Sequence, residues 1–186
     1  RQQREVEIIA EAGRLIREQG LDALHMDNLA EIVGISKPTL YQHFKSKEDL
    51  IPRIFLDGIE DLERYLLSTT QNPPMERLQN TLRMLLEKRY GNQGQATGVS
   101  SELVFLMLHS RDDLVDAKGR VWKLVDAVVE EGKARGKIDP VIPTAHVSCM
   151  IFTLLRLPAP AEMEHELETA IQHIVQMFTR AIQPTS

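Results

Sequence analysis

The segment from His25 to Leu50 constrains the fold of this chain more than any other stretch. Apolar residues recur at helical spacing as far as Val33, and Gly34 follows where a left-handed backbone commonly ends a helix. Ser36 is then a favourable N-cap for a second helix. Pro38 falls in the first turn of that helix, where a missing N–H costs little. The segment therefore predicts a helix, a tight turn and a second, short helix.

Two helices joined by such a turn form a helix-turn-helix, which places its second helix in the major groove of DNA. We predict these helices at about residues 26–33 and 37–44, with Leu40 and Phe44 facing inward because they are four residues apart. The remaining side chains of the second helix include an amide and hydroxyls, which bind base edges, and a lysine, which neutralises phosphate. These side chains, which we expect to be exposed in various directions, are those of Lys37, Thr39, Tyr41, Gln42 and His43.

The charge pattern supports a nucleic-acid partner only locally. The 186-residue chain has a formal net charge of −5, yet no acidic residue lies between Glu31 and Glu48, where three lysines occur. DNA affinity would therefore rest on a local basic patch that dimerisation doubles, and not on bulk charge. We expect the affinity for DNA to weaken steeply with salt.

This stretch resembles the tetracycline-repressor-type (TetR) family of bacterial transcriptional regulators. The resemblance covers about residues 5–51 and rests on Ala30, Gly34-Ile35-Ser36, Leu40-Tyr41, His43-Phe44 and Lys47. It implies that Tyr41 and His43 position the DNA backbone and that Lys47 anchors a phosphate. It also implies that bases are contacted by Lys37, Pro38, Thr39 and Gln42.

His25 departs from the family pattern, which usually has Thr or Ser at this position. Histidine is a poorer N-cap, so the phosphate contact made by the family residue is in doubt here. An imidazole at this position would still donate to a phosphate, more strongly below about pH 6.5. The alternative is a plain exposed loop histidine.

The chain is predicted to be all-α, because β-type alternation is absent. We expect a helix-turn-helix DNA-binding domain over residues 1–46 and a helical ligand-binding and dimerisation domain over residues 47–186. Helices are predicted at about residues 3–19, 26–33, 37–44, 47–68, 75–90, 101–109, 112–135 and 141–156, with a last one that starts among the acidic residues from Glu162.

Three local features of these helices carry expectations. The buried stripe of the first helix is predicted to contain Val6, Ile9, Ala12, Gly13, Leu15 and Ile16. Ser46, with Asp49 three residues on, indicates a variant capping box at the start of the fourth helix. Pro52 lies inside that helix and marks either a hinge that transmits ligand state or a first turn that tolerates proline.

The penultimate helix is apolar on most sides, which indicates burial on all sides and favours a partner subunit as the extra cover. The family resemblance implies that the last two helices pair with their mates in a four-helix homodimer interface. The candidate interface residues are Val147, Ile151, Leu154, Ile171, Val175 and Phe178. A dimer would require a near-palindromic DNA site with half-sites about one helical turn apart.

A small apolar or amphipathic effector is expected in the C-terminal domain. Candidate pocket residues are Phe105, His109, Trp122 and His146. For the two histidines a satisfied or exposed role is favoured, and Trp122 could line the same cavity or fill the core. The glycine-containing stretch 91–100 is either a pocket lid or, more simply, a connection.

The sequence gives little support for an enzyme. Neither a glycine-rich phosphate loop nor a metalloprotease or hydrolase motif is present, so no cofactor is expected. Glu162, His165 and Glu168 have helical spacing, but a solvated acidic helix start is favoured over a metal site. The single cysteine, Cys149, excludes an internal disulfide, and we expect a buried inert thiol and not a redox sensor. The chain contains no long uncharged apolar run or leader pattern, so we expect a cytoplasmic protein with no membrane span.

The favoured function is a sequence-specific transcriptional regulator, a repressor that a small-molecule effector releases from a palindromic operator. The alternative is a DNA-binding adaptor whose C-terminal domain binds a protein partner instead of a small ligand.

Overall fold

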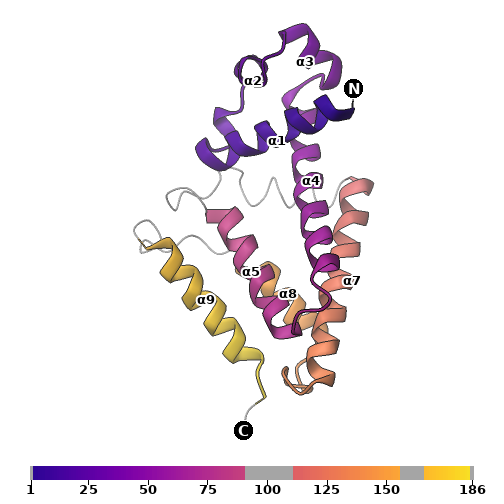
Figure 1. Cartoon of the computed structure of the whole chain (residues 1–186), viewed down its shortest axis with the longest axis vertical. Helices are drawn as coiled ribbons and strands as arrows, with labels where there is room; N and C mark the ends of the chain where they lie inside the picture. The colour runs from indigo at the N-terminus through magenta and orange to yellow at the C-terminus, as the bar shows by residue number, and fades with distance from the viewer. Residues whose placement is uncertain (1, 91–110, 156–165, 185–186) are drawn as a thin grey trace.

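The computed structural model describes residues 2–90, 111–155 and 166–184, in which every regular element is helical and no β-strand occurs. The predicted all-α fold is confirmed. Figure 1 shows a small helical unit at the N-terminal end, from which one long helix runs down into a group of longer helices.

The N-terminal unit is built from one long and several short helical elements. These are α1 (Gln2–Gln19), the single 3-10 turn η1 (Leu21–Ala23), α2 (Met26–Val33) and α3 (Lys37–His43). Their shared core is aliphatic, and its fully buried members are Ile8, Ala12, Leu24, Leu29 and Leu40. This core fixes α3 against α1 and α2, so that one side of α3 remains open to solvent.

The buried stripe of α1 differs from the prediction at its first residue. Val6 is 57% exposed, whereas Ile8, which was not assigned to the stripe, is fully buried. Ile8, Ala12 and Leu15 follow one another at helical spacing, and α1 packs against both α2 and α4. The position of these two neighbours decides which face of α1 is buried.

The long helix α4 (Lys47–Ser68) belongs to both halves of the molecule (Figure 1). Leu50 and Ile51 lie in the N-terminal core, whereas Leu62 and Leu66 lie in the C-terminal core. Phe55, between them, contacts the N-terminal core and a small cluster formed with α7. The packing therefore changes from one core to the other inside α4, and the division at residues 46/47 remains a prediction.

The start of α4 is capped differently from the expected box. Ser46 occupies the N-cap position, but its side chain makes no capping hydrogen bond among the described residues. The backbone N–H of Lys45 instead donates to the Asp49 carboxylate at 3.3 Å. Pro52 is buried inside the helix, which continues through it without interruption.

The C-terminal helices pack as one group around an aliphatic core. They are α5 (Pro74–Tyr90), α7 (Asp112–Ala134), α8 (Thr144–Leu154) and α9 (Leu167–Ile182). Helix α7 packs against α4, α5 and α8, while α9 packs along α5. The central side chains are fully buried, including those of Leu78, Leu82, Leu86, Val125 and Phe178.

The chain reverses after α7 in a tight turn that depends on two glycines. Gly136 has φ 65°, a left-handed conformation, and the N–H of Lys137 donates to the Gly132 carbonyl at 2.9 Å. A Cβ on Gly132 would lie 2.5 Å from Cδ1 of the buried Ile138. A side chain at position 132 would therefore require the buried side chain of Ile138 to move.

Helix α8 is shorter and less enclosed than predicted. It begins at Thr144, three residues later than expected, because residues 140–143 form a turn bounded by two prolines. Cys149 is exposed in this structure of one chain. The expectation of a buried thiol is therefore wrong for the single chain. The predicted helix at residues 101–109 and the predicted start of the last helix lie outside the described residues.

Candidate nucleic-acid interface

The turn between α2 and α3 has the geometry that its sequence predicts. Gly34 adopts φ 72°, and the N–H of Ile35 donates to the Ala30 carbonyl at 2.9 Å, which closes the end of α2. Ser36 caps α3 by accepting the N–H of Thr39 at 3.2 Å. These bonds set the angle between the two helices without using any side chain of the exposed face of α3.

The exposed side of α3 carries most of the predicted base-contacting groups. Leu40 is fully buried and Phe44 is 6% exposed, so the opposite side of the helix faces solvent. Lys37, Pro38 and Gln42 are exposed, and Tyr41 is 45% exposed. Thr39 is only half-buried, and its hydroxyl lies 2.7 Å from the hydroxyl of Ser36.

A surface pocket of about 480 Å³ lies beside this face. It is lined by Leu24, His25, Met26, Asp27, Tyr41 and Lys47. The pocket thus combines an ammonium, a phenol and an imidazole with the N-terminus of α2, whose first N–H groups have no partner within the helix. Such N–H groups and the Lys47 ammonium together favour an anion, whereas the Asp27 carboxylate at the same pocket opposes one.

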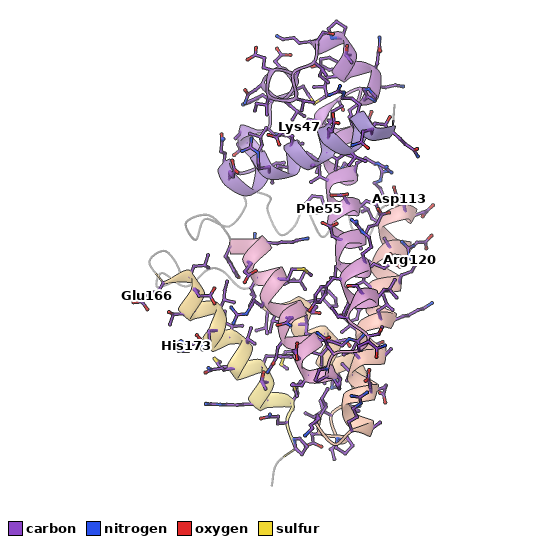
Figure 2. All side chains as sticks on the ribbon, in the orientation of Figure 1. Lys47, Phe55, Asp113, Arg120, Glu166 and His173 are labelled. Atoms are coloured by element: carbon purple, nitrogen blue, oxygen red, sulfur yellow. The ribbon has the colours of Figure 1, made fainter. Side chains whose placement is uncertain are left out.

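Lys47, labelled in Figure 2, is held in place by the backbone of η1. Its Nζ donates to the Leu21 carbonyl at 2.6 Å, and the side chain is partly buried. An ammonium has three N–H donors, so this bond orients the group and leaves two donors for a further acceptor. The structure thus positions Lys47 in the pocket, while its role as a phosphate anchor remains a prediction.

Lys37 has a partner that the sequence did not indicate. Its Nζ donates to the Asp27 carboxylate at 2.7 Å, and both side chains are more than half exposed. The hydrogen bond from Lys37 to Asp27 raises the pKa of the ammonium. The positive patch is therefore partly neutralised, and Lys37 must exchange Asp27 for DNA if it is to contact a base or phosphate.

His43 is placed differently from the prediction. Its side chain is only 9% exposed, and its Nδ1 lies 3.2 Å from the Glu5 carboxylate of α1. The expectation that its imidazole is exposed is wrong, because residue 43 lies on the side of α3 that faces α1. The imidazole is placed to hold α1 against α3 and thereby to orient the helix that carries Tyr41.

His25 is the N-cap residue of α2 and is exposed. Its backbone is extended, with φ −112° and ψ 129°, and its side chain makes no capping hydrogen bond within the described part of the chain. The imidazole therefore lies at the pocket without filling the role of a helix cap.

The predicted effector residues are only partly within the described segments. Phe105 and His109 lie outside them. Trp122 of α7 is half-buried and packs on Phe152 of α8 with ring centroids 4.6 Å apart. His146 is exposed, so it does not line an enclosed cavity among the described residues.

The residues predicted for the dimer interface lie mostly inside one chain. Five of the six are at most 7% exposed in the C-terminal core, namely Val147, Ile151, Ile171, Val175 and Phe178. Only Leu154 is partly exposed. Side chains buried within one chain have little surface left for a partner subunit, and the assignment of these residues to a dimer interface remains a prediction.

Two buried polar contacts in the C-terminal helices were not predicted. The Ser148 hydroxyl donates to the Asp126 carboxylate at 2.5 Å, and the 6%-exposed Arg77 bonds to the Glu131 carboxylate at 3.0 Å. The only signal in the sequence was a serine within the apolar run of α8, because the other partners are brought together from distant helices.

Neither a membrane span nor a metal cluster is present in the parts of the chain that the structure describes. No helix there is long and apolar enough to cross a membrane. No group of three or more His, Cys, Asp or Glu residues is suitably placed there for a metal ion.

Comparison with known proteins agrees with this geometry. Residues 8–54 match the family model described as bacterial regulatory proteins, tetR family. The matched segment contains the helix-turn-helix, the pocket and the first turns of α4.

Similarity to known proteins also extends beyond this segment, over the C-terminal helices. The uncharacterised HTH-type transcriptional regulator YvaF of Bacillus subtilis is 25% identical over 178 residues, which cover 94% of this chain and 93% of that protein. The HTH-type transcriptional repressor KstR2 of Mycobacterium tuberculosis is 27% identical over 141 residues, or 72% of this chain and 70% of that protein. A solved structure of AibR in complex with isovaleryl coenzyme A and operator DNA has a similar fold, with TM-score 0.60 and 23% identity over 94% of this chain and 97% of that one.

Proposed function

Because the chain belongs to the tetR family of bacterial transcriptional regulators, which are DNA-binding proteins and not enzymes, we propose that it is a repressor. In this proposal a homodimer binds a near-palindromic operator and leaves it when a small effector binds the C-terminal helices. The observation that carries the proposal is the pocket of His25, Tyr41 and Lys47 beside the exposed side of α3.

The DNA-contacting groups divide into two sets by chemistry. Lys37, Pro38, Thr39 and Gln42 belong to α3, the helix that would enter the major groove, and are assigned to base edges. Tyr41, Lys47 and His25 surround the pocket and are assigned to a phosphate, because a phenol, an ammonium and an imidazole all donate hydrogen bonds. His43 is assigned a positioning role through Glu5.

The outer side of α9 supports the dimer. Its stripe Ile171, Val175, Phe178 and Ile182 is buried within the chain. A second apolar stripe lies alongside it and is formed by Ala170, Ile174, Met177 and Ala181. Met177 is 70% exposed, and an apolar stripe that reaches the surface in this way supports contact with a second copy of the chain.

The effector is proposed to be an amphipathic molecule, with acyl-coenzyme A thioesters as the first class to test. The C-terminal core is almost wholly aliphatic, which suits an acyl chain. The similar protein AibR has been solved with isovaleryl coenzyme A and operator DNA, which supports this class. KstR2 is a transcriptional repressor and supports repression as the output.

The operator is found by selecting binding sequences from a random duplex pool with the dimeric protein at moderate salt. We expect one near-palindrome to be enriched, and enrichment to disappear when Tyr41 and Lys47 are both replaced by alanine. Absence of enrichment by a folded dimer would contradict sequence-specific binding. Acyl-coenzyme A thioesters of increasing chain length are then titrated into the complex, and failure of all of them to release DNA would favour the protein-binding adaptor.

The dimer is tested with a charge placed on the outer side of α9. Met177→Glu should shift the protein from dimer to monomer in sedimentation experiments, because a carboxylate buried without a partner is costly. Leu67→Glu is the matched control, since Leu67 is a 54% exposed apolar residue on α4. A Met177→Glu protein that remains as dimeric as the control would exclude this side of α9 as the interface.

A further inference from the structure

Lys37 and Asp27 form an exposed ion pair at the start of α3. Lys37 is the first residue of α3, and its Nζ donates to the Asp27 carboxylate of α2 at 2.7 Å. The two side chains are 53% and 60% exposed, so both charged groups are accessible to a macromolecule. In a helix-turn-helix the first residues of the second helix contact base edges. A base edge that meets Lys37 therefore also meets the carboxylate of Asp27.

Asp27 is an acidic residue on a face that is expected to bind a polyanion. An exposed ion pair contributes little to folding stability, so the fold does not depend on this carboxylate. Beside DNA phosphates a carboxylate lowers the affinity for DNA of any sequence. In the major groove, however, it has a favourable partner, because Asp and Glu accept a hydrogen bond from the N4 amine of cytosine.

The ion pair matches the major-groove edge of a G·C base pair. Guanine presents two acceptors, O6 and N7, to which lysine donates, and cytosine presents its N4 amine as a donor. O6 and N4 are joined by a Watson–Crick hydrogen bond, so they lie about 2.9 Å apart. Lys37 Nζ and Asp27 Oδ2 lie 2.7 Å apart. The ammonium can thus face guanine, and the carboxylate cytosine, while the two charges stay side by side.

We propose that Asp27 is a specificity-determining residue that binds cytosine while Lys37 binds the guanine of the same base pair. The inference rests on the proposed function, since it requires α3 to bind an operator. On the operator Lys37 exchanges its hydrogen bond to Asp27 for bonds to O6 and N7, and Asp27 accepts an N–H of N4 in return. At an A·T pair no single base offers lysine two adjacent acceptors, so the ion pair stays closed and Asp27 only weakens binding.

The expected size of the effect follows from the loss of one charge-assisted hydrogen bond. Asparagine keeps an acceptor oxygen without the charge, and a bond to a charged group is about twice as strong as a neutral one. Asp27→Asn should therefore lower the preference for G·C over A·T by about fivefold in each half-site, or about 25-fold on a two-site operator. On a duplex of mixed sequence the same substitution should raise affinity by about threefold per subunit.

The experiment begins with the half-site that the wild-type dimer selects from a random duplex pool at moderate salt. Each position of this half-site is then changed to the other three base pairs in both halves of a fluorescein-labelled duplex. Affinities are measured by anisotropy at one salt concentration for the wild type, Asp27→Asn and Lys37→Met. We expect the wild type to prefer G·C at one position, and both substitutions to weaken the preference at that same position.

Glu31→Gln is the matched control. Glu31 is an exposed acidic residue one helical turn after Asp27 on α2, and the substitution removes the same charge. The hydrogen bond to Asp27 raises the pKa of the Lys37 ammonium most, and the charge of Glu31 adds a smaller increase. Glu31→Gln should therefore leave the preference for G·C unchanged, although it removes a negative charge near the same lysine.

Three outcomes would contradict the inference, and they have different meanings. If Asp27→Asn raises the affinity for every duplex equally, Asp27 acts only by repelling phosphates, and the proposed function stands. If the operator holds no G·C position that responds to Lys37→Met, the assignment of the ion pair to a base pair is wrong, and the proposed function again stands. Absence of any enriched sequence with a folded wild-type dimer would overturn both.

Discussion

Replacing Lys47 with methionine should weaken DNA binding through the loss of one phosphate contact in each subunit. Lys47 lines the pocket beside α3, and its Nζ donates to the Leu21 carbonyl at 2.6 Å. Methionine keeps most of the aliphatic length but removes the charge and all of its donors. The substitution therefore tests whether the two remaining ammonium donors bind DNA.

The magnitude follows from counterion release. Each phosphate neutralised on duplex DNA contributes about 0.9 to the slope of log affinity against log salt. A dimer with one Lys47 in each half-site would lose about 1.8 from this slope. Between 50 and 200 mM salt the affinity of the wild type should therefore fall by about 12-fold more than that of the variant.

The assay is fluorescence anisotropy on one labelled duplex at several salt concentrations. Lys137→Met is the control, because Lys137 is an exposed lysine in the turn after α7, at the other end of the molecule, and the charge change is the same. Thermal unfolding is measured in parallel, since the lost bond to Leu21 is expected to cost about 1–2 kcal/mol of stability. A slope equal to that of Lys137→Met would refute the phosphate contact and leave Lys47 as a structural tie between α4 and η1.

Three further substitutions test other contacts. Asp27→Asn should raise the affinity for duplex DNA, measured by anisotropy, by about threefold per subunit. The substitution removes an exposed carboxylate beside the pocket and frees Lys37, which pairs with it. Unchanged affinity would mean that this ion pair is irrelevant to DNA binding. Gly132→Ala should lower the free energy of unfolding, measured in urea, by about 1–3 kcal/mol, because the added methyl would lie 2.5 Å from Ile138 Cδ1. A variant as stable as the wild type would show that the turn relaxes without cost. Arg77→Ala should destabilise by about 1–3 kcal/mol in the same assay, because the buried Leu66 carbonyl loses a donor and Glu131 keeps only Arg135 as its partner. Arg77→Met is expected to recover part of the packing, and equal stability of Arg77→Ala and wild type would contradict a structural role for Arg77.

The sequence by itself determined the helix-turn-helix and its capping. Gly34 and Ser36 act within a few residues of their own positions, so the bounds of α2 and the start of α3 followed from local backbone chemistry. Helical spacing likewise placed Leu40 and Phe44 in the core. Each of these predictions depends only on residues a few positions away in the sequence.

Tertiary structure decided which polar groups meet and which apolar faces are covered. His43 contacts Glu5, 38 positions earlier in the sequence, and Lys37 contacts Asp27 across the turn. No local sequence pattern predicts either pair. On α9 the periodicity indicated an apolar stripe but could not say that α5 of the same chain, and not a partner, covers Phe178. The physical reason is that helical periodicity specifies one face of one helix, whereas the identity of what packs on that face depends on where the connecting turns place the other helices.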